Sequence, residues 1–419
     1  VATSALREAK NREELVRRAR DEAGLSLDVV SGREEARLIC LGVLHGKGPR
    51  ARSLSIDIGG GSTEIIQGRG FQPHTMESLY MGCVSLSARA FPGGKLTARN
   101  FRQARQAARL ELEPVKAKFL AREPVRVAGT SGTIQAAYEV LLSMGRARKG
   151  ITVDDLEFLI GQLVAAGHTN HLYLPGLSTD RMEVFPGGVA ILVEVMTALR
   201  VRRLMVADGA LREGMLYDMI GRLTDEDARV RTVRAMQRRF HVDPAQARRV
   251  SETGLGLLRQ VADDWDLRRD SDRNLLAWAA ALHELGLDIA HAHYHRHGAY
   301  LLENADMPGF TRDEQRVLAC LVGSHRRKPG VDALEALPRE WRQRAGRLVA
   351  LLRLAVLFNR GRSPRVAARP VLEARDHGLR LSLPARWLRD NPLSEADLEQ
   401  ESRHLAVLGL AMRVVRRRR

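Results

Sequence analysis

Residues 55–66, SIDIGGGSTEII, decide how the first half of this chain folds. Three consecutive glycines and two hydroxyl residues stand between apolar, β-branched runs, with Asp57 before the glycines and Glu64 after the hydroxyls. The apolar runs predict two strands joined as a hairpin by an extended polar turn. Because glycine permits positive φ and has no Cβ, consecutive N–H groups in this turn can approach a phosphate oxygen closely.

The two acids that flank this turn indicate a metal ion as well as a phosphate. A carboxylate is repelled by a phosphate unless a cation lies between them, and Mg²⁺ uses one or two carboxylates together with substrate oxygens. The stretch therefore predicts Mg²⁺ on Asp57 and Glu64. The alternative is a glycine hairpin with two surface acids. A Walker A loop would need Lys at Ser62, and a Rossmann loop would lead into a helix.

The composition favours a protein with substantial cores and polyanionic partners. The chain has 419 residues, of which 44% are hydrophobic, and a formal net charge of +17. This charge favours nucleic acid, an acidic membrane surface or a phosphate-rich substrate, although no basic–aromatic interleaving suggests specific nucleic-acid binding. No apolar run reaches the roughly 18–20 residues of a membrane span. The three scattered cysteines predict neither a disulfide framework nor a zinc site, so we expect a cytoplasmic setting.

The periodicity divides the chain into an α/β half and a helical half near residue 220. We expect helices over 4–23 and 32–46, a strand over 25–31, helical segments around 97–122, a strand at VRVAG and a helix over 187–200. A strand at RRLMVAD and a helix at GALREGMLYDMI follow. After about residue 222 the pattern is helical, apart from a small β unit near 370–384. Recurrent strand, glycine loop and helix units predict loops that converge on one ligand.

Two further stretches carry candidate chemistry. In SGREEARL, helical periodicity places Glu35 on the inward stripe with Leu38 and Ile39, and Glu34 nearer the solvent. Glu35 can orient a water molecule and accept its proton, or the pair can be first-turn acids that interact with the helix dipole. In AGTSGTIQAA, glycines and hydroxyls open a helix, which makes either an anion site or a simple cap.

At these residues the chain resembles the exopolyphosphatase / guanosine pentaphosphate phosphohydrolase (Ppx/GppA) family. The matching stretches include ATSALREAKN, SGREEARL, SIDIGGGSTEI, MGCVSLSARAFPGG, AGTSGTIQAA, LPGLSTDR and DGALREGMLYDM. The resemblance implies actin-like (ribonuclease H-like) α/β domains followed by an all-helical HD-like domain and a small α+β domain. The implied domains are 1–38, the remnant of a first actin-like domain, 39–219, a second one, 222–356, the HD-like domain, and 357–419, the basic C-terminal domain.

The same resemblance assigns roles to matching positions. It implies that Glu35 is the catalytic base and that Asp57 and Glu64 hold Mg²⁺. It further implies a phosphate site and, less directly, residues that line the cleft. The phosphate site comprises Gly59, Gly60, Gly61, Ser62, Thr63 and the basic Arg7. The lining comprises Gly129, Ser131, Gly132 and Thr133.

The helical half contains a histidine-rich stretch, HELGLDIAHAHYHRH, within the block that resembles the long exopolyphosphatase form. Metal binding is one interpretation, but the doublet is His283-Glu284 and the alternating histidines do not share one helical face. We therefore favour an HD-like fold used for packing and substrate binding. Four basic residues nearby either contact a polyphosphate chain or form a solvated face. They are Arg296, Arg326, Arg327 and Lys328.

The predicted function is exopolyphosphatase activity: processive, Mg²⁺-dependent release of orthophosphate from the end of inorganic polyphosphate, by a homodimer. Hydrolysis of guanosine pentaphosphate (pppGpp) is the alternative with the same chemistry. A non-catalytic polyphosphate or nucleotide sensor is the alternative of another class. The family's first phosphate loop, Asp-x-Gly-Ser-Asn-Ser, would precede ATSALR, so we expect this chain to be an N-terminally truncated fragment.

Overall fold

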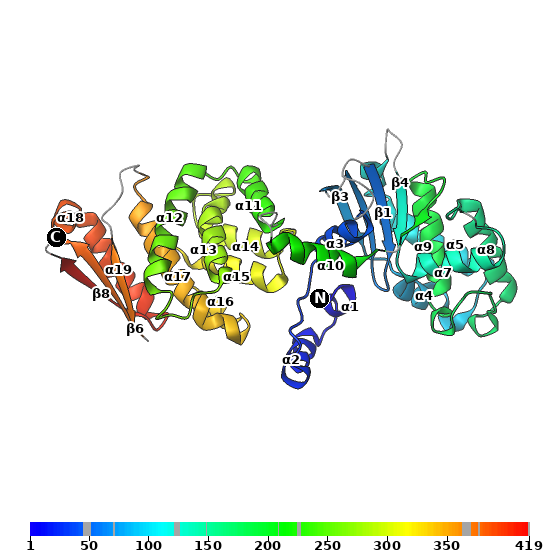
Figure 1. The fold of residues 1–419 in the computed structure, drawn as a ribbon, viewed down its shortest axis with the longest axis horizontal. Helices are drawn as coiled ribbons and strands as arrows, with labels where there is room; N and C mark the ends of the chain where they lie inside the picture. Colours follow the sequence, from blue (N-terminus) through cyan, green and yellow to red (C-terminus); the bar gives the residue numbers. More distant parts are fainter. Residues whose placement is uncertain are drawn as a thin grey trace. The chain divides into compact units, whose positions relative to one another are not determined.

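The chain forms two compact units, Val1–Ala228 and Arg229–Arg419, in a computed structural model (Figure 1). The structure describes residues 1–44, 52–69, 72–120, 126–147, 149–207, 209–223, 228–362, 370–375 and 378–417. Among these residues, no helix is long and apolar enough to cross a membrane.

A five-stranded mixed sheet organises unit 1. Its order is β3-β2-β1-β4-β5. The pairs β3–β2 and β2–β1 are antiparallel, and the pairs β1–β4 and β4–β5 are parallel. The strands are β1 (Arg52–Ile58), β2 (Thr63–Arg69), β3 (Gln72–Leu79), β4 (Arg126–Thr130) and β5 (Met205–Val206). The expected hairpin is β1–β2 and is confirmed. Strand β3 was not predicted, and β5 is shorter than RRLMVAD suggested.

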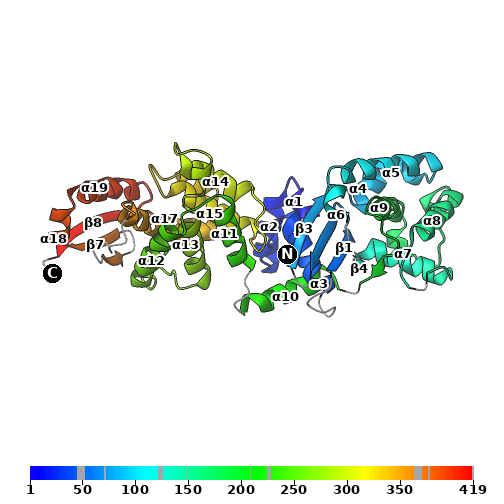
Figure 2. The same ribbon diagram turned by 90° about the horizontal axis from the view of Figure 1, so that it is seen from above.

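The two faces of this sheet carry different layers of helices (Figure 2). Because side chains alternate along β1, Leu54, Ile56 and Ile58 point to one face of the sheet, into the larger of the two cores of unit 1. Helices α4, α5, α7, α8 and α9 pack against this core. On the other face, α3 packs over Ile66 and Ala128, and α10 packs on α3. The helices are α3 (Gly32–Leu44), α4 (Cys83–Ala90), α5 (Ala98–Leu112), α6 (Lys116–Phe119), α7 (Gly132–Ser143), α8 (Val153–Ala166), α9 (Phe185–Ala198) and α10 (Leu211–Leu223); the short 3₁₀ turns are Pro92–Gly94, Thr169–His171 and Thr179–Arg181.

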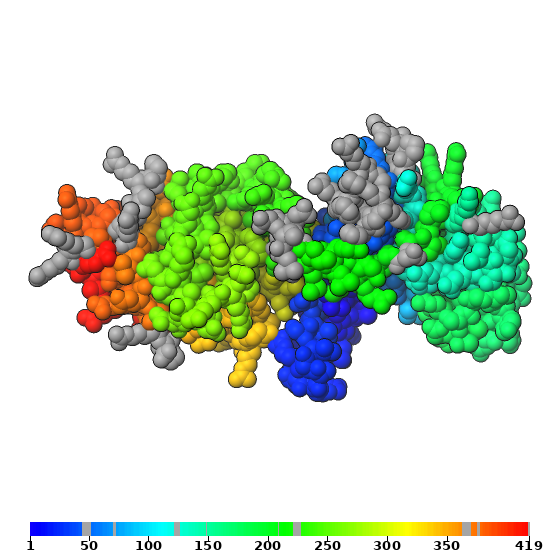
Figure 3. Space-filling view, viewed as in Figure 1, coloured from blue at the N-terminus to red at the C-terminus, as the bar shows by residue number. Residues whose placement is uncertain are grey.

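The N-terminal segment differs from the expected single helix over 4–23. It forms α1 (Ser4–Arg7) and α2 (Arg12–Ala23), which ends at Gly24 in the left-handed conformation. The expected strand over 25–31 is reduced to a single bridge between Val29 and Ala2. Helix α2 buries none of its residues, and in the space-filling view it projects away from the sheet of unit 1 (Figure 3). Its charged sequence, REELVRRARDEA, leaves it no apolar face large enough to pack.

Unit 2 is a helical bundle joined to a small sheet by one continuous core. Strands β6 and β7 pair as the expected β unit, and β8, which was not predicted, adds parallel to β7. Leucines of this sheet and the helical Trp265 and Trp278 belong to the same cluster of buried residues. The elements are α11 (Ala228–Arg239), α12 (Pro244–Val261), α13 (Asp270–Leu282), a 3₁₀ turn (Leu285–Asp288), α14 (Tyr294–Asn304), α15 (Arg312–Ser324), α16 (Val331–Glu335), α17 (Arg339–Asn359), β6 (Val371–Arg375), β7 (Gly378–Pro384), α18 (Ala385–Asp390), α19 (Pro392–Ala406) and β8 (Ala411–Arg417).

Helices α3 and α10 approach each other at glycines. A Cβ on Gly214 of α10 would overlap the carbonyl oxygen of Leu38, and one on Gly42 of α3 would overlap that of Ala210. The two backbones are therefore in direct contact, and the position of α3 depends on the absence of side chains at these sites.

We expect Gly214→Ala to destabilise unit 1 by about 1–3 kcal/mol, because the added methyl group forces two packed helices apart. Urea denaturation monitored by circular dichroism measures this loss. Gly161→Ala on α8 is the matched control, because its Cβ would have no neighbour within 4 Å. The control should be neutral or slightly stabilising, since alanine favours a helix interior over glycine. Equal stability of the two variants would contradict the packing account.

Candidate active site

The hairpin register places the two carboxylates of the opening stretch side by side. Asp57 on β1 pairs directly with Glu64 on β2. Directly opposed residues of an antiparallel pair project from the same face, with Cβ atoms about 5 Å apart. This is the face that α3 covers, and both residues are buried, with exposed fractions of 8% and 1%. The polar turn therefore brings the acids together, as the sequence predicted.

Burial makes these carboxylates unusually reluctant to ionise. It raises the pKa of Asp57 to about 7 and that of Glu64 to about 8, and the nearby negative charge of Glu35 adds to both shifts. Ser78 Oγ donates a hydrogen bond of 2.8 Å to Glu64 Oε1, but no Arg or Lys forms an ion pair with Asp57 or Glu64 in the described part of the chain. A proton or a bound cation is therefore needed to offset the negative charge of this buried pair.

Glu35 lies in the first turn of α3, above the same face of the sheet. Arg7 Nη1 lies 3.3 Å from Glu35 Oε2 and donates a 2.9 Å hydrogen bond to the carbonyl of Val30. Burial raises the pKa of Glu35, although the charge of Arg7 and the hydroxyl of Thr3 oppose this shift. The structure thus gathers Arg7, Glu35, Asp57 and Glu64 around one place, and Glu35 points inward as helical periodicity predicted.

Glu34 is also buried, and the prediction that it lies nearer the solvent is wrong. Its carboxylate accepts two hydrogen bonds from Arg37, at 2.7 and 2.8 Å. Arg37 also contacts Asp218 of α10 at 2.5 Å. Burial opposes the charge of Arg37, but the two acids raise its pKa. Periodicity missed this group because the partner Asp218 is distant in sequence, and the ion pairs let an acid lie inside.

The glycine loop is held so that two of its N–H groups point away from α4. The carbonyls of Gly59 and Gly60 accept hydrogen bonds from Cys83 and Val84 at the start of α4. In a trans peptide the next N–H points the opposite way, so the N–H groups of Gly60 and Gly61 point away from α4. Neither donates to a protein acceptor in the described ranges.

In this loop, close packing rather than backbone conformation restricts Gly61 and the neighbouring Gly82. None of Gly59, Gly60 and Gly61 has the positive φ that the sequence suggested. A Cβ on Gly61 would lie 2.8 Å from Ser4 Oγ of α1, and one on Gly82 would overlap the loop backbone. Of the two hydroxyls, Ser62 hydrogen-bonds Glu64 and Thr63 donates to the carbonyl of Met81 at 2.6 Å. The Thr63 hydroxyl therefore makes a structural hydrogen bond within the protein.

The second loop reaches the same edge, because β4 runs parallel to β1 and both end there. Ser131 has a left-handed φ of 90° and accepts a 3.3 Å hydrogen bond from the Ile58 amide. Gly129 and Thr133 instead pack in the core: a Cβ on Gly129 would meet Leu204, and Thr133 contacts α9. Of the four expected lining residues, Ser131 and Gly132 are thus the two at the site.

Arg181 was not singled out from the sequence, although it lies in the quoted stretch LPGLSTDR. Its guanidinium covers Gly132, so closely that a Cβ on Gly132 would overlap it. It therefore lies at the N-terminus of α7, where the helix macrodipole is positive and where an anion rather than a cation is favourable. No ion-pair partner for Arg181 is found in the described ranges. The only signal in the sequence was an arginine within the polar stretch LPGLSTDR.

The four basic residues expected along a polyphosphate chain all belong to unit 2. Arg326 and Arg327 line one cavity of that unit. Arg296 on α14 and Lys328 after α15 are exposed and do not line that cavity. The structure therefore brings two of the four together.

The residues at the edge of the unit 1 sheet fit a hard divalent cation. Carboxylate oxygens are the donors that Mg²⁺ prefers, and two of them leave positions for water and substrate oxygens. The two opposed carboxylates without a cationic partner also meet the charge requirement. A site made wholly of protein ligands is not present, since no group of three His, Cys, Asp or Glu residues in the described ranges could hold a metal ion.

In metal-free buffer we expect the free energy of unfolding to fall as the pH rises from about 4 to 8. Unfolded carboxyls lose their protons near pH 4, whereas Asp57 and Glu64 keep theirs until about pH 7 and 8, so the folded state binds more protons in this window. The loss is on the order of a few kcal/mol. Denaturation of the wild type and of Asp57→Asn with Glu64→Gln at pH 5, 6.5 and 8 tests this expectation. An equal pH dependence in the double variant would contradict it.

Two solved structures resemble part of the chain. One is an exopolyphosphatase from Cytophaga hutchinsonii, with a TM-score of 0.47 and 25% identity, covering 52% of this chain and 72% of that one. The other is the PPX-GPPA enzyme of Aquifex aeolicus, with a TM-score of 0.43 and 25% identity, covering 51% of this chain and 73% of that one.

The similarity in sequence to known proteins extends over more of the chain than the similarity to these two structures. A guanosine-5'-triphosphate,3'-diphosphate pyrophosphatase of Vibrio cholerae is 37% identical over 412 residues, which is 98% of this chain and 82% of that protein. The same enzyme from a second strain matches equally. The model of the Ppx/GppA phosphatase family matches residues 1–223, and that of Ppx/GppA phosphatase domain III matches residues 228–402. The chain therefore belongs to the Ppx/GppA phosphatase family, whose members hydrolyse phosphoric anhydrides.

Proposed function

We propose that this chain removes the terminal phosphate from a phosphoanhydride substrate, with Glu35 as the general base. The single observation that carries the proposal is the gathering of Glu35, Asp57 and Glu64 beside the glycine loop, in which the N–H groups of Gly60 and Gly61 donate to no protein acceptor in the described ranges. One carboxylate near two others has an elevated proton affinity, which suits proton transfer near neutral pH.

In this mechanism the N–H groups of Gly60 and Gly61 and the hydroxyl of Ser62 bind oxygens of the terminal phosphate. Glu35 accepts a proton from a water molecule whose oxygen forms a bond to the terminal phosphorus. The bridging P–O bond breaks, and its electron pair goes to the shortened substrate. Arg7 and Arg181 offer guanidinium groups to the phosphate oxygens; Arg7 also orients Glu35 through their ion pair.

Asp57 and Glu64 would hold Mg²⁺. The ion would supply positive charge where negative charge develops on the phosphate oxygens. The two acids suit this role because burial without a cationic partner makes the ionised pair costly until a cation is present.

The substrate is best sought among two phosphoanhydrides. The similarity to the Vibrio cholerae enzyme over nearly the whole chain supports guanosine pentaphosphate. The net charge of +17 supports inorganic polyphosphate, the substrate that we predicted first from the sequence. In the polyphosphate case, Arg296, Arg326, Arg327 and Lys328 of unit 2 would contact polyphosphate. Unit 2 would also contain the HD-like domain.

We expect Glu35→Gln to lower the turnover number by about 10²–10⁴, because the amide cannot accept the water proton. Orthophosphate release from long-chain polyphosphate and from guanosine pentaphosphate, measured in parallel, gives both the rate and the preferred substrate. Glu13→Gln is the matched control, because Glu13 is an exposed residue of α2. Unchanged release by Glu35→Gln would exclude Glu35 as the base. Tight binding of both substrates without turnover by the wild type would favour the sensor function.

We also expect Mg²⁺ to raise the melting temperature of the wild type by several degrees at pH 8, since a saturating ligand of the folded state adds about 2.7 kcal/mol at 100 times its Kd. Asp57→Asn and Glu64→Gln should each lose most of this shift. Differential scanning calorimetry with Mg²⁺ and with EDTA measures it. A full shift in both variants would place the metal elsewhere.

A further inference from the structure

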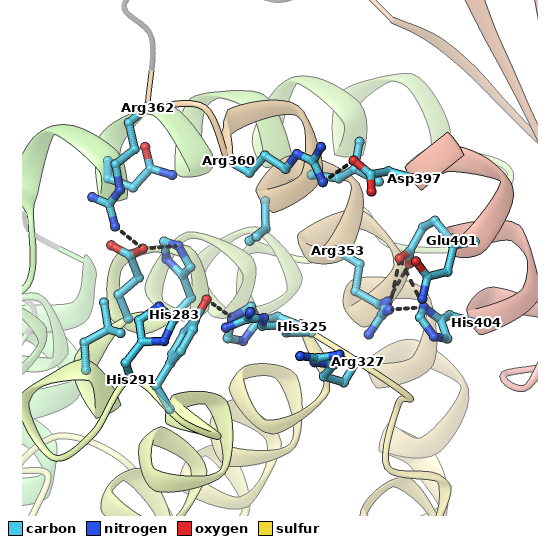
Figure 4. Close-up of a pocket in the computed structure, with 18 residues that line it drawn as sticks. His283, His291, His325, Arg327, Arg353, Arg360, Arg362, Asp397, Glu401 and His404 are labelled. Carbon is cyan, nitrogen blue, oxygen red and sulfur yellow. Dashed lines mark hydrogen bonds and ion pairs between the residues drawn. The ribbon is translucent and has the colours of Figure 1, made fainter. Parts of the chain in front are cut away.

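Unit 2 contains a cavity that is lined by residues of several of its helices. Its volume is about 530 Å³, a size typical of small-molecule sites. Its walls come from the turn after α13, the segment after α15, the C-terminal end of α17 and one face of α19 (Figure 4). The proposed catalytic residues take no part in it.

Charged side chains dominate this cavity. Its acids all pair with arginines. The carboxylates are Glu284, Asp397 and Glu401, and the arginines are Arg326, Arg327, Arg353, Arg360 and Arg362.

Each carboxylate is neutralised by a different arginine. Arg353, which is almost fully buried, donates two hydrogen bonds to Glu401, at 2.5 and 2.9 Å. Arg362 contacts Glu284 at 2.5 Å, and Arg360 pairs with Asp397. These pairs account for three arginines and all three acids, so they leave the cavity with a positive excess.

Arg326 and Arg327 carry this excess. Within the described ranges neither forms an ion pair with a carboxylate. The Arg326 guanidinium lies over the ring of Tyr294, 5.1 Å from its centroid, which orients it. Arg327 has a left-handed φ of 62°, an uncommon conformation for a residue other than glycine. In Figure 4 it bonds to none of the other residues drawn.

Two of the histidines that line the cavity are fixed by hydrogen bonds to backbone carbonyls. His283 Nδ1 donates to Ala280 at 2.7 Å, and His325 Nδ1 donates to Val322 at 2.5 Å. Because a carbonyl only accepts, these contacts fix the proton on Nδ1. Burial lowers the pKa of both rings, and the positive charge of Arg353 also lowers that of His325.

His404 has the opposite orientation. Its Nδ1 accepts a 3.0 Å hydrogen bond from Arg353 Nη2, so in the neutral ring Nε2 carries the proton. The cavity therefore contains a neutral N–H donor besides the two unpaired guanidinium groups. Donors of both kinds suit an anion with several oxygens.

A purely structural role explains the three ion pairs but not the two remaining arginines. The dipole of α15 favours basic residues near its C-terminus, yet it does not require them to line a cavity with arginines from α17. Guanidinium groups bind phosphate oxygens in a bidentate manner, and clustered ones recognise compact polyphosphorylated groups.

We propose that this cavity is a second, non-catalytic site that binds a compact di- or triphosphate group through Arg326 and Arg327. The group belongs either to a short inorganic phosphate oligomer or to a nucleotide. Such a site would let unit 2 sense or retain a phosphorylated ligand independently of hydrolysis in unit 1.

Isothermal titration calorimetry of the full chain tests this proposal. The background is Glu35→Gln in EDTA, where turnover is blocked and no metal ion is available to help unit 1 bind anions. The probes are inorganic tripolyphosphate and guanosine triphosphate. We expect one saturable site, whose affinity Arg327→Glu and Arg326→Gln each lower by about tenfold or more. Arg259→Glu is the control of equal charge change to Arg327→Glu, because Arg259 is exposed on α12 outside the cavity.

The outcomes separate the two proposals and the two ligand sources. Binding of tripolyphosphate alone identifies an inorganic oligomer, and tighter binding of guanosine triphosphate identifies a nucleotide. No saturable binding, or equal weakening by Arg259→Glu, would overturn the second site, while orthophosphate release by the wild type would still support the proposed hydrolase. If the chain binds either probe saturably but the wild type releases no orthophosphate, the second site is supported and the proposed hydrolase function is overturned. Circular dichroism of each variant confirms that a lost site does not reflect unfolding.

Discussion

The opposition of Asp57 and Glu64 across the β1–β2 pair is the constraint on which the rest of unit 1 depends. The register places two buried carboxylates on one face, and Glu35 of the covering helix adds a third negative group. Such an arrangement costs stability unless protons or a cation neutralise it. A one-residue slip would turn one strand's acid to the opposite face, so the hairpin register and the chemistry of the site are inseparable.

The packing around this hairpin brings two glycine-containing loops to one edge of the sheet. Helix α4 fixes the carbonyls of the glycine loop and thereby aims its N–H groups, while the parallel pairing of β1 with β4 brings Ser131 to the same edge. Helix α3 carries Glu35, and α10 fixes α3 through glycine contacts and the Arg37–Asp218 pair. The position of Glu35 therefore depends on a helix that contributes no residue to the candidate site.

Much of this site could be predicted from local sequence, because its information is local. The hairpin acids lie seven residues apart, and helical periodicity is enough to turn Glu35 inward. The burial of Glu34 and the place of Arg181 could not be predicted, because each depends on a partner distant in sequence, Asp218 in one case and Gly132 in the other. The strand β3 was missed because its sequence, QPHTMESL, is mostly polar and gains its structure by pairing with β2.

The same reasoning explains why the charge of the whole chain is a weaker guide to substrate than the local balance of charges. A net charge of +17 suggests long polyanions, but many arginines of unit 2 are used up in ion pairs, such as those of Glu284 and Glu401. Guanidinium groups without a carboxylate partner contribute most to binding a phosphate, since a paired arginine shares its charge and its donors with its acid. Arg181 in unit 1 and Arg327 in unit 2 meet this condition in the described ranges. Substrate preference in this chain is therefore better sought in a few unpaired arginines than in its overall basicity.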